Sequence, residues 1–296
     1  MTIWNYLGYS PDSVQSVLAD LPNQYKSYRI EKRSGSYRRI DAPKRLLLLI
    51  QQSILYKILY LFKAHPIAHG FIKHKSPKTS AMVHLGKQFV ATIDIKDFFP
   101  TIKEDRVKAL FKFLLPKQYL FNVTEEDYDI LTSLVCYKHR LPQGAPTSPT
   151  ISNLVCLHLD AELAKLAIEQ TCVVTRYADD VTISKIEKPE NVKELLLKFQ
   201  AIIKIHGYEI NKKKLRYRYH WKRQLVNGIV VNTKLNTPKE YWRNLRAEIH
   251  NLKSNNILIT EKSLQILKGK IEWVRTLNHQ RGNQLSKQLE DVLASR

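Results

Sequence analysis

The sequence contains few acidic residues for its size. Only 27 of its 296 residues are Asp or Glu, against 48 Lys or Arg, which gives a formal net charge of +21. A surplus of this size repels itself unless an anionic partner neutralises it, so nucleic acid is the first candidate partner and an anionic membrane surface a distant second. The shortage also means that an acid inside an apolar segment calls for an explanation.

Glycine, proline and long apolar runs are also scarce. The chain has 9 Gly and 12 Pro while 44% of it is hydrophobic, which excludes a disordered or collagen-like protein. Two glutamines, a serine and a lysine interrupt the most apolar run, residues 46–62, so we expect a buried amphipathic helix there and not a membrane span. The first ten residues lack a basic segment followed by an apolar one, so we expect no signal peptide.

Cysteine is rare as well. Cys136, Cys156 and Cys172 are an odd number, have no metal-type spacing and lie among apolar neighbours. We therefore expect packed, reduced thiols in a cytoplasmic protein that does not enter a membrane.

The pattern of apolar and turn-forming residues predicts an α+β fold with a helical C-terminal part. The elements that we expect are, in chain order, a helical lead-in over 1–25, a basic hairpin over 25–43 with its tip at RSGS, a helix over 44–63, a loop and then a helix within 67–87, a buried strand over 88–95, helices over 104–135, a loop opening a long helix over 141–170, a hairpin over 173–184, a helix over 190–206, a strand over 225–232, and helices from about 238 to the end.

A basic octamer, RYRYHWKR (216–223), interleaves cations with aromatic residues. This composition suits the binding of phosphates together with stacked bases or sugars. It equally suits an exposed strand whose aromatic side chains face the core, and we expect Trp221 to be a core residue.

Two adjacent acids stand out in VVTRYADDVTIS (173–184), where Asp179 and Asp180 separate two β-branched runs. One interpretation is a hairpin tip, where Asp is a common turn residue. The other is a metal site, where the charge of the ion relieves the repulsion between the carboxylates. This segment alone leaves both interpretations open.

A third acid, Asp94, ends an apolar run that we expect to be buried, VATIDI (90–95). An unpaired buried carboxylate costs on the order of several kcal/mol. Two strands that each present such an acid share a need for a cation, and carboxylate oxygens suit Mg²⁺. A pair of such ions is the arrangement used for in-line phosphoryl transfer.

Six blocks of sequence, running in order from about residue 28 to 290, resemble a reverse transcriptase, most closely the bacterial retron type. The blocks are SYRRIDAP with the helix after it, TIDIKDFFPTI, LPQGAPTSPTISN, RYADD, GYEINKKKL and LKGKIEWVRTLNHQRGNQL. The resemblance implies a right-hand polymerase fold. Residues 1–235 would form the fingers and palm, and residues 236–296 a helical, RNA-binding thumb.

The resemblance assigns the three acids to catalysis. It implies that Asp94 and Asp179 ligate two Mg²⁺ ions, that Asp180 supports the site from the same turn, and that the carbonyl group of Ile95 is a further ligand.

It also implies a binding site for deoxynucleoside triphosphates. Arg38 would contact the triphosphate, Lys214 would protonate the pyrophosphate, and Gln143 and Gly144 would line the nucleotide pocket. The ring of Phe99 would block a ribose 2′-hydroxyl, so the product would be DNA. Taken singly, Arg38 is more commonly a cation of a solvated basic strand, and Lys214 is as readily a cation of a solvated loop.

The neighbours of Phe99 carry less specific expectations. We expect the ring of Phe98 to face the core, and Asp97 to be a turn residue and not a ligand.

Two retron signatures are only partly present. The chain has SAMVH (80–84) where retron enzymes show Asn-Ala-x-x-His, and VNG (226–228) where they show Val-Thr-Gly. The resemblance implies RNA binding by four residues of these segments. They are His84, Val226, Asn227 and Gly228.

The implied activity is RNA-directed DNA synthesis. Template and primer would be a cognate noncoding RNA, primed from a 2′-hydroxyl to give a branched RNA–DNA product (msDNA), in anti-phage defence with an effector or toxin protein. Two alternatives stay open: another bacterial defence-type reverse transcriptase with a different priming mode, or an RNA-binding scaffold with a vestigial polymerase site. The three intact acids argue against a scaffold.

Overall fold

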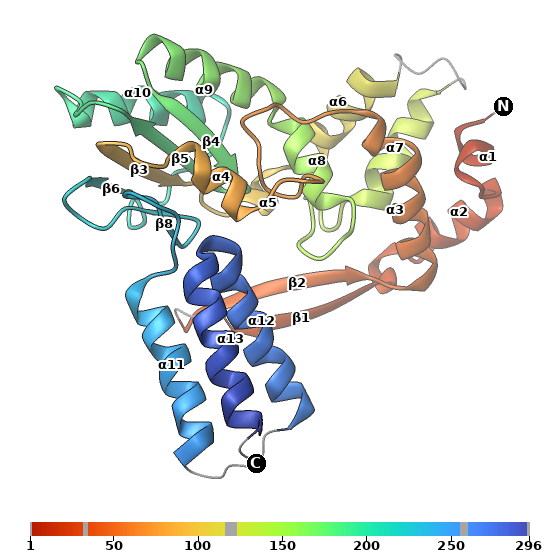
Figure 1. Ribbon diagram of the computed structural model, residues 1–296. Coiled ribbons are helices and arrows are strands. Elements are labelled where there is room, and N and C mark those ends of the chain that lie inside the picture. The colour runs from red at the N-terminus through yellow and green to blue at the C-terminus, as the bar shows by residue number, and fades with distance from the viewer. Residues whose placement is uncertain (1, 32–34, 116–122, 255–259, 295–296) are drawn as a thin grey trace.

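The computed structural model describes residues 2–31, 35–115, 123–254 and 260–294 (Figure 1). The helices are α1 (Ile3–Leu7), α2 (Pro11–Ala19), η1 (Leu21–Gln24), α3 (Arg45–Lys57), η2 (Leu59–Leu61), α4 (Pro77–Val83), α5 (Phe98–Thr101), α6 (Glu104–Leu114), α7 (Glu125–Val135), α8 (Ser148–Val155), α9 (Leu157–Glu169), α10 (Val192–Ile205), α11 (Lys239–Ser254), α12 (Glu261–Leu277) and α13 (His279–Ala294). The strands are β1 (Tyr25–Glu31), β2 (Tyr37–Pro43), β3 (Phe89–Asp94), β4 (Val173–Tyr177), β5 (Asp180–Lys185), β6 (Arg216–Tyr219), β7 (Leu225–Val226) and β8 (Ile229–Val230).

Four antiparallel strands form the central sheet, in the order β4-β5-β3-β6. Its two central strands, β3 and β5, are almost wholly buried, as their Val-, Ile- and Thr-rich runs predict. Alternate residues of β3 enter different clusters: Phe89, Ala91 and Ile93 enter the main core, whereas Val90 enters a smaller one with Ala81 and Val226. The sheet is therefore covered on both faces.

Different elements cover these two faces. Helices α9 and α10 lie on the side of the main core, and α4 with the β7–β8 hairpin lies on the other side (Figure 1). Because Asp94 is the last residue of β3, this packing fixes the end of the strand that carries the candidate site.

The β1–β2 hairpin extends from the body of the protein, with Tyr25 paired to Pro43 and Glu31 to Tyr37. Part of its expected tip, RSGS (33–36), lies outside the described residues. The expected helix over 44–63 ends early, because the chain turns at Ile58 (φ −116°, ψ −64°) and continues as η2.

Two other helical expectations also differ in detail. The helices expected over 104–135 are α6 and α7, and residues 116–122 between them lie outside the described residues. The long helix expected within 141–170 is divided at Cys156 into α8 and α9.

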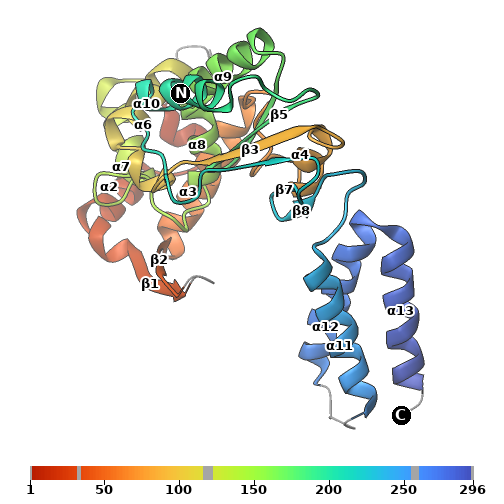
Figure 2. The ribbon, with the colours of Figure 1, turned by 90° about the vertical axis from the view of Figure 1, so that its left-hand side faces the viewer.

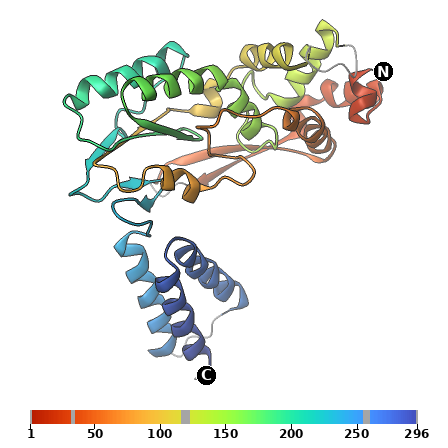
Figure 3. The same cartoon turned by 45° about the horizontal axis from the view of Figure 1, so that its top comes forward.

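The three C-terminal helices lie together, apart from the central sheet (Figure 2). They have an apolar core of their own. Gly282 of α13 lies so close to α12 that an added Cβ would come within 2.2 Å of Arg275 Cβ, so only glycine allows this approach. Figure 3 shows the same three helices outside the central sheet and the helices that cover it. Residues 255–259 and 295–296, which we expected to be helical, lie outside the described residues.

Three further expectations concern Trp221, the cysteines and membrane spans. Trp221 is 66% exposed and stacks on Tyr219 with 4.6 Å between ring centroids, so the expectation of a core residue is wrong. It follows the edge strand β6, where only the neighbouring Tyr219 packs on the core. The three cysteines are free. No helix of the described residues is both long and apolar enough to cross a membrane.

Candidate active site

The pairing of β3 with β5 brings together acids that are distant in sequence. Asp94 and Asp180 are partners in the register, and the Ile95 N–H donates to the carbonyl oxygen of Asp179 at 2.8 Å. Asp94, Asp179 and Asp180 therefore meet at the same end of the sheet. Ile95 itself is buried, and ligation of a metal by its carbonyl group stays a prediction.

These acids lie in an unfavourable electrostatic setting. Burial and the charge of Asp94 raise the pKa of Asp179, against a backbone hydrogen bond and the charges of Lys214 and Arg38, which lower it. Burial and the charges of Asp179 and Asp94 raise the pKa of Asp180 to about 6. Lys214 Nζ donates to Asp94 Oδ2 at 2.8 Å, and this bond raises the pKa of the lysine.

The donor atoms suit a divalent cation. Carboxylate oxygens are hard ligands, which divalent cations such as Mg²⁺ prefer. The charge of such a cation also relieves the repulsion between the clustered carboxylates. Among the described residues, no three or more His, Cys, Asp or Glu side chains are arranged as a ready metal cage. Lys214 Nζ lies against Asp94 instead, so a metal at this carboxylate must share it with the lysine or displace the lysine.

The β1–β2 hairpin, the turn before α5 and the loop before α8 form the neighbouring wall. Arg38, Asp97, Arg140 and Gln143 line a cavity of about 170 Å³ between them. The exposed Arg38 acts on Asp179 through its charge, which connects this cavity to the acids.

Gly144 holds this wall close to the hairpin. Its φ is +122°, and an added Cβ would lie 2.8 Å from Ile40 Cγ2 and 3.0 Å from the Asp41 carbonyl oxygen. The Asp41 N–H donates to the Gln143 carbonyl oxygen at 2.7 Å. The glycine therefore lets strand β2 approach the loop, which is a different use of the missing Cβ from the approach of a bound nucleotide that we expected.

Three aromatic rings lie together at Phe99, the residue expected to contact the sugar. Phe99 is half-buried and packs against Phe71, with 6.1 Å between centroids, and Phe71 lies 6.5 Å from Tyr177. Phe98 faces the core, as expected. Asp97 has a φ of +45° immediately before α5, which is the turn conformation expected for it.

The expected RNA-binding role of His84 is not supported by its position, because the side chain is fully buried. Its ring nitrogens hydrogen-bond to the hydroxyl groups of Ser184 and Thr175 at 2.7 and 2.8 Å, and Ser80 hydrogen-bonds to Thr175 at 3.0 Å. Burial lowers the pKa of His84 to about 3, so the ring is neutral. This residue joins α4 to the sheet and presents no surface to RNA.

The three residues of the second signature, VNG (226–228), have different positions in the structure. Val226 is fully buried and packs with Ala81, so direct RNA binding by this side chain is also not supported. Asn227 and Gly228 form the two-residue turn of the β7–β8 hairpin, with φ +50° and +79°. Asn-Gly is the preferred pair for such a type I′ turn, a structural signal that we had interpreted only as a variant of Val-Thr-Gly.

The comparisons with known proteins agree with this geometry. A family model described as "Reverse transcriptase (RNA-dependent DNA polymerase)" matches residues 30–267. The chain belongs to the reverse transcriptase family. This family uses a divalent metal, and its members act on a nucleic-acid template and product.

The curated relatives narrow the type. The chain is 33% identical to the Retron Mx162 reverse transcriptase of Myxococcus xanthus, over 92% of this chain and 62% of that protein. It is 34% identical to the Retron Ec86 reverse transcriptase of Escherichia coli, over 77% of this chain and 70% of that protein. It is therefore a retron-type member, and it spans less than two thirds of the length of its Mx162 relative.

Solved structures show the fold. A telomerase from Candida albicans, in complex with a fragment of telomeric RNA, has a TM-score of 0.53 at 12% identity, covering 89% of this chain and 56% of that one. An apo telomerase from Candida tropicalis has a TM-score of 0.54 at 14% identity, covering 90% and 58%. The prediction of an α+β right-hand fold is confirmed.

Sequence reasoning missed several side chains around this site in the reverse transcriptase. They are Phe71, Arg140, Asn153, Asp160 and Arg176. A signal existed for Arg176, because a charged residue interrupts the apolar strand VVTRY, whereas the positions of the others depend on contacts between distant segments.

Proposed function

We propose that this chain is the RNA-directed DNA polymerase of a retron, which copies a cognate structured noncoding RNA into single-stranded DNA. The observation that carries the proposal is the meeting of Asp94, Asp179 and Asp180 at one end of the palm sheet in a member of the reverse transcriptase family. Burial and mutual repulsion make this arrangement unfavourable without a cation, so a function in metal binding accounts for it.

Two Mg²⁺ ions complete the proposed site. Asp94 and Asp179 would ligate both, Asp180 would support the site from the same turn, and the carbonyl group of Ile95 would be a further ligand. Ions held by these residues would supply activation of the primer hydroxyl group and stabilisation of the leaving pyrophosphate.

The surrounding side chains bind the incoming deoxynucleoside triphosphate. Arg38 is an exposed cation that lines the same cavity as Gln143, and this position supports a contact with the triphosphate. Lys214, hydrogen-bonded to Asp94, is the proton donor to pyrophosphate. The ring of Phe99 excludes a ribose 2′-hydroxyl, and Gly144 keeps the fingers strand against the pocket.

The cognate RNA serves as both template and primer. The curated relatives are retron reverse transcriptases, and the net charge of +21 supports a polyanionic partner. Priming from a 2′-hydroxyl would give a branched RNA–DNA product. Asn227 and Gly228, at the turn of the β7–β8 hairpin, and the cations of the thumb over 236–296 would contact the RNA. A role in anti-phage defence with an effector protein, in the cytoplasm, belongs to the same proposal.

A double substitution, Asp179→Asn with Asp180→Asn, tests the polymerase assignment. It keeps side-chain size and removes the charges that hold the ions, so DNA synthesis from deoxynucleotides should fall by at least about a thousandfold. RNA binding, measured by filter retention, should stay within about twofold, because neither acid attracts phosphate. Asp12→Asn, at an exposed acid of α2, is the control and should leave both quantities unchanged.

Two outcomes would contradict the proposal. Full synthesis by the double variant would remove the acids from catalysis. A wild-type chain that binds RNA but makes no labelled DNA with Mg²⁺ would instead be an RNA-binding scaffold. Sequencing the RNA–DNA junction of the co-purified nucleic acid would identify the primer hydroxyl and decide between retron priming and another mode.

A further inference from the structure

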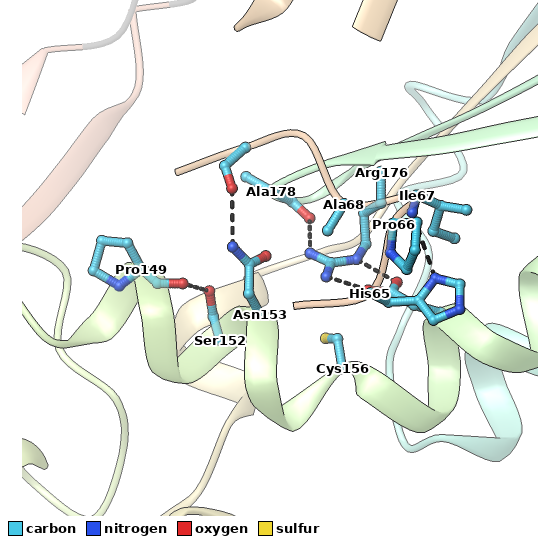
Figure 4. A network of polar contacts seen from close by, with 12 residues as sticks. His65, Pro66, Ile67, Ala68, Pro149, Ser152, Asn153, Cys156, Arg176 and Ala178 are labelled. Carbon is cyan, nitrogen blue, oxygen red and sulfur yellow. Dashed lines mark hydrogen bonds and ion pairs between the residues drawn. The ribbon is translucent and has the colours of Figure 1, made fainter. Parts of the chain in front are cut away.

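A buried ionic network lies behind the turn that carries Asp179 (Figure 4). Arg176 of β4 donates from Nε and Nη2 to the two carboxylate oxygens of Asp160 on α9, at 2.6 Å each. Both side chains are fully buried. The third guanidinium nitrogen, Nη1, donates to the carbonyl oxygen of Ala178 at 3.2 Å. One side chain therefore joins helix α9 to the residue that precedes Asp179.

A second segment presses on the same turn. The Arg176 N–H donates to the carbonyl oxygen of Ile67 at 2.8 Å, and the His69 N–H donates to that of Arg176 at 2.7 Å. Asn153 of α8, labelled in Figure 4, then donates from Nδ2 to the carbonyl oxygen of Gly70 at 2.9 Å. Residues 67–70 thus lie along β4 and reach the turn.

The contact at the end of this segment has no spare room. An added Cβ on Gly70 would lie 2.7 Å from the backbone nitrogen of Ala178, so the two backbones touch. Ala178 has a φ of +55°, a conformation that costs free energy for a residue other than glycine. Such a turn persists only where its surroundings determine it, and here these are the guanidinium group and the 67–70 segment.

Stability alone does not explain the buried pair. Removing two charges from water is expensive, and replacing such a pair by apolar residues of similar volume often leaves stability unchanged or raises it. What apolar residues cannot supply is the third hydrogen bond, to Ala178. A lysine has only a point charge and cannot reproduce the planar fork.

We propose that Arg176 is a positioning residue of the polymerase: held by Asp160, it fixes the carbonyl group of Ala178 and thereby the direction in which Asp179 presents its carboxylate to the metal. This inference rests on the proposed function, because the direction of the Asp179 carboxylate matters for activity only if this residue binds the catalytic metal. Arg176 itself lies behind the turn and does not contact the substrate.

A double variant, Arg176→Met with Asp160→Val, separates positioning from structural support. It removes both charges together, so the full-length protein should keep its Tm within a few degrees. If Arg176 positions Asp179, kcat should fall by about 10- to 100-fold, since a misplacement of about 1 Å has an effect of that size. The KM for deoxynucleotide should stay within about twofold, because the triphosphate contacts are intact. Arg176→Lys should fall between the wild type and the double variant.

A binding measurement makes the test independent of turnover. Titration of the full-length protein with Mn²⁺, followed by electron paramagnetic resonance, measures the affinity for the metal. This affinity should be weaker than that of the wild type by at least about threefold in the Arg176→Met, Asp160→Val variant and in Arg176→Lys. Gln51→Leu is the matched control. It removes two buried hydrogen bonds, to the Tyr25 hydroxyl and to the Leu134 carbonyl oxygen, and should lower Tm without changing kcat or Mn²⁺ affinity.

Wild-type kcat and Mn²⁺ affinity in the folded double variant would overturn the inference. If that variant does not fold, Arg176→Lys decides, since it keeps the charge beside Asp160; wild-type values in it would overturn the inference equally. A wild-type protein that binds Mn²⁺ but makes no DNA would contradict the proposed function instead, while the Mn²⁺ titrations of the variants would still report on the turn.

Discussion

In the proposed site, Lys214 is the side chain that joins Asp94, a proposed metal ligand, to the proposed nucleotide pocket. Its Nζ lies 2.8 Å from Asp94 Oδ2, yet 57% of the lysine side chain is exposed. Solvent screens the exposed end of this ion pair, and a lysine side chain rotates easily. In the proposed function, a cation at Asp94 and an anionic pyrophosphate nearby would both favour rotation of the ammonium group from the carboxylate to the phosphate, which is the movement that a proton donor to pyrophosphate requires.

Two adjacent phenylalanines should respond in opposite ways to truncation. Phe99→Ala opens the half-buried position between Phe71 and the proposed sugar site, so incorporation of ribonucleotides should rise by at least about tenfold relative to deoxynucleotides, with a smaller loss of stability than truncation of a fully buried ring. Phe98→Ala removes a buried ring and should lower the free energy of unfolding by about 3–5 kcal/mol without changing sugar selectivity. Competition assays with paired nucleotides, and urea unfolding, measure the two effects. Unchanged selectivity in Phe99→Ala would place the discrimination elsewhere.

At the scale of elements, local pattern was a good guide to type and a poor guide to ends and faces. The apolar run 88–95 and the hairpin 173–184 were recognisable because their β-branched residues occupy a sheet covered on both faces. The division at Cys156 and the turn at Ile58 were not recognisable, because both continue an apolar pattern that also suits a longer helix.

The candidate site was predictable to a similar extent. The residues of the acid cluster are unusual in apolar strands, so the sequence singled them out. The sequence did not show that His84 and Val226 are buried, because their burial depends on α4 and the β7–β8 hairpin packing on one face of the sheet. Contacts between segments about a hundred residues apart leave no local signal.

The joint between α4 and the sheet should weaken in acid. Burial lowers the pKa of His84 to about 3, whereas a histidine in an unfolded chain has a pKa of about 6.5. Below pH 6.5 the unfolded chain therefore binds a proton that the folded chain does not, and His84 alone should reduce the free energy of unfolding by about 2 kcal/mol between pH 7.5 and pH 5. Urea unfolding at several pH values in this range measures the loss.

His84→Gln is the matched variant, because it keeps hydrogen-bonding atoms and cannot titrate. Its pH slope should be shallower by about one proton and should not vanish, since burial also lowers the pKa of His69, to about 4. An unchanged slope in this variant would show that His84 is not a source of the acid sensitivity.

For the whole molecule, the surplus of positive charge has two opposite consequences. The charges of a +21 chain repel one another in the folded state, and local ion pairs such as Lys270–Glu248 in the thumb relieve only part of the repulsion. The same charges attract a polyanion along the fingers, palm and thumb at once. Binding of RNA should therefore stabilise the fold, because a ligand that binds only the folded state raises its stability.

Salt should weaken both effects together. If the RNA is held mainly through phosphates, its affinity should fall by at least about a hundredfold between 50 and 200 mM salt, and the increase in Tm that RNA produces should shrink in parallel. Fluorescence anisotropy and calorimetry at matched salt concentrations measure the two quantities. The Asp179→Asn, Asp180→Asn variant is the control: it changes the charge at the metal ligands and removes no phosphate contact, so its salt dependence should equal that of the wild type. An affinity independent of salt would mean that contacts with bases and RNA shape, and not the charge surplus, hold the partner, and the excess of lysine and arginine would then need another explanation.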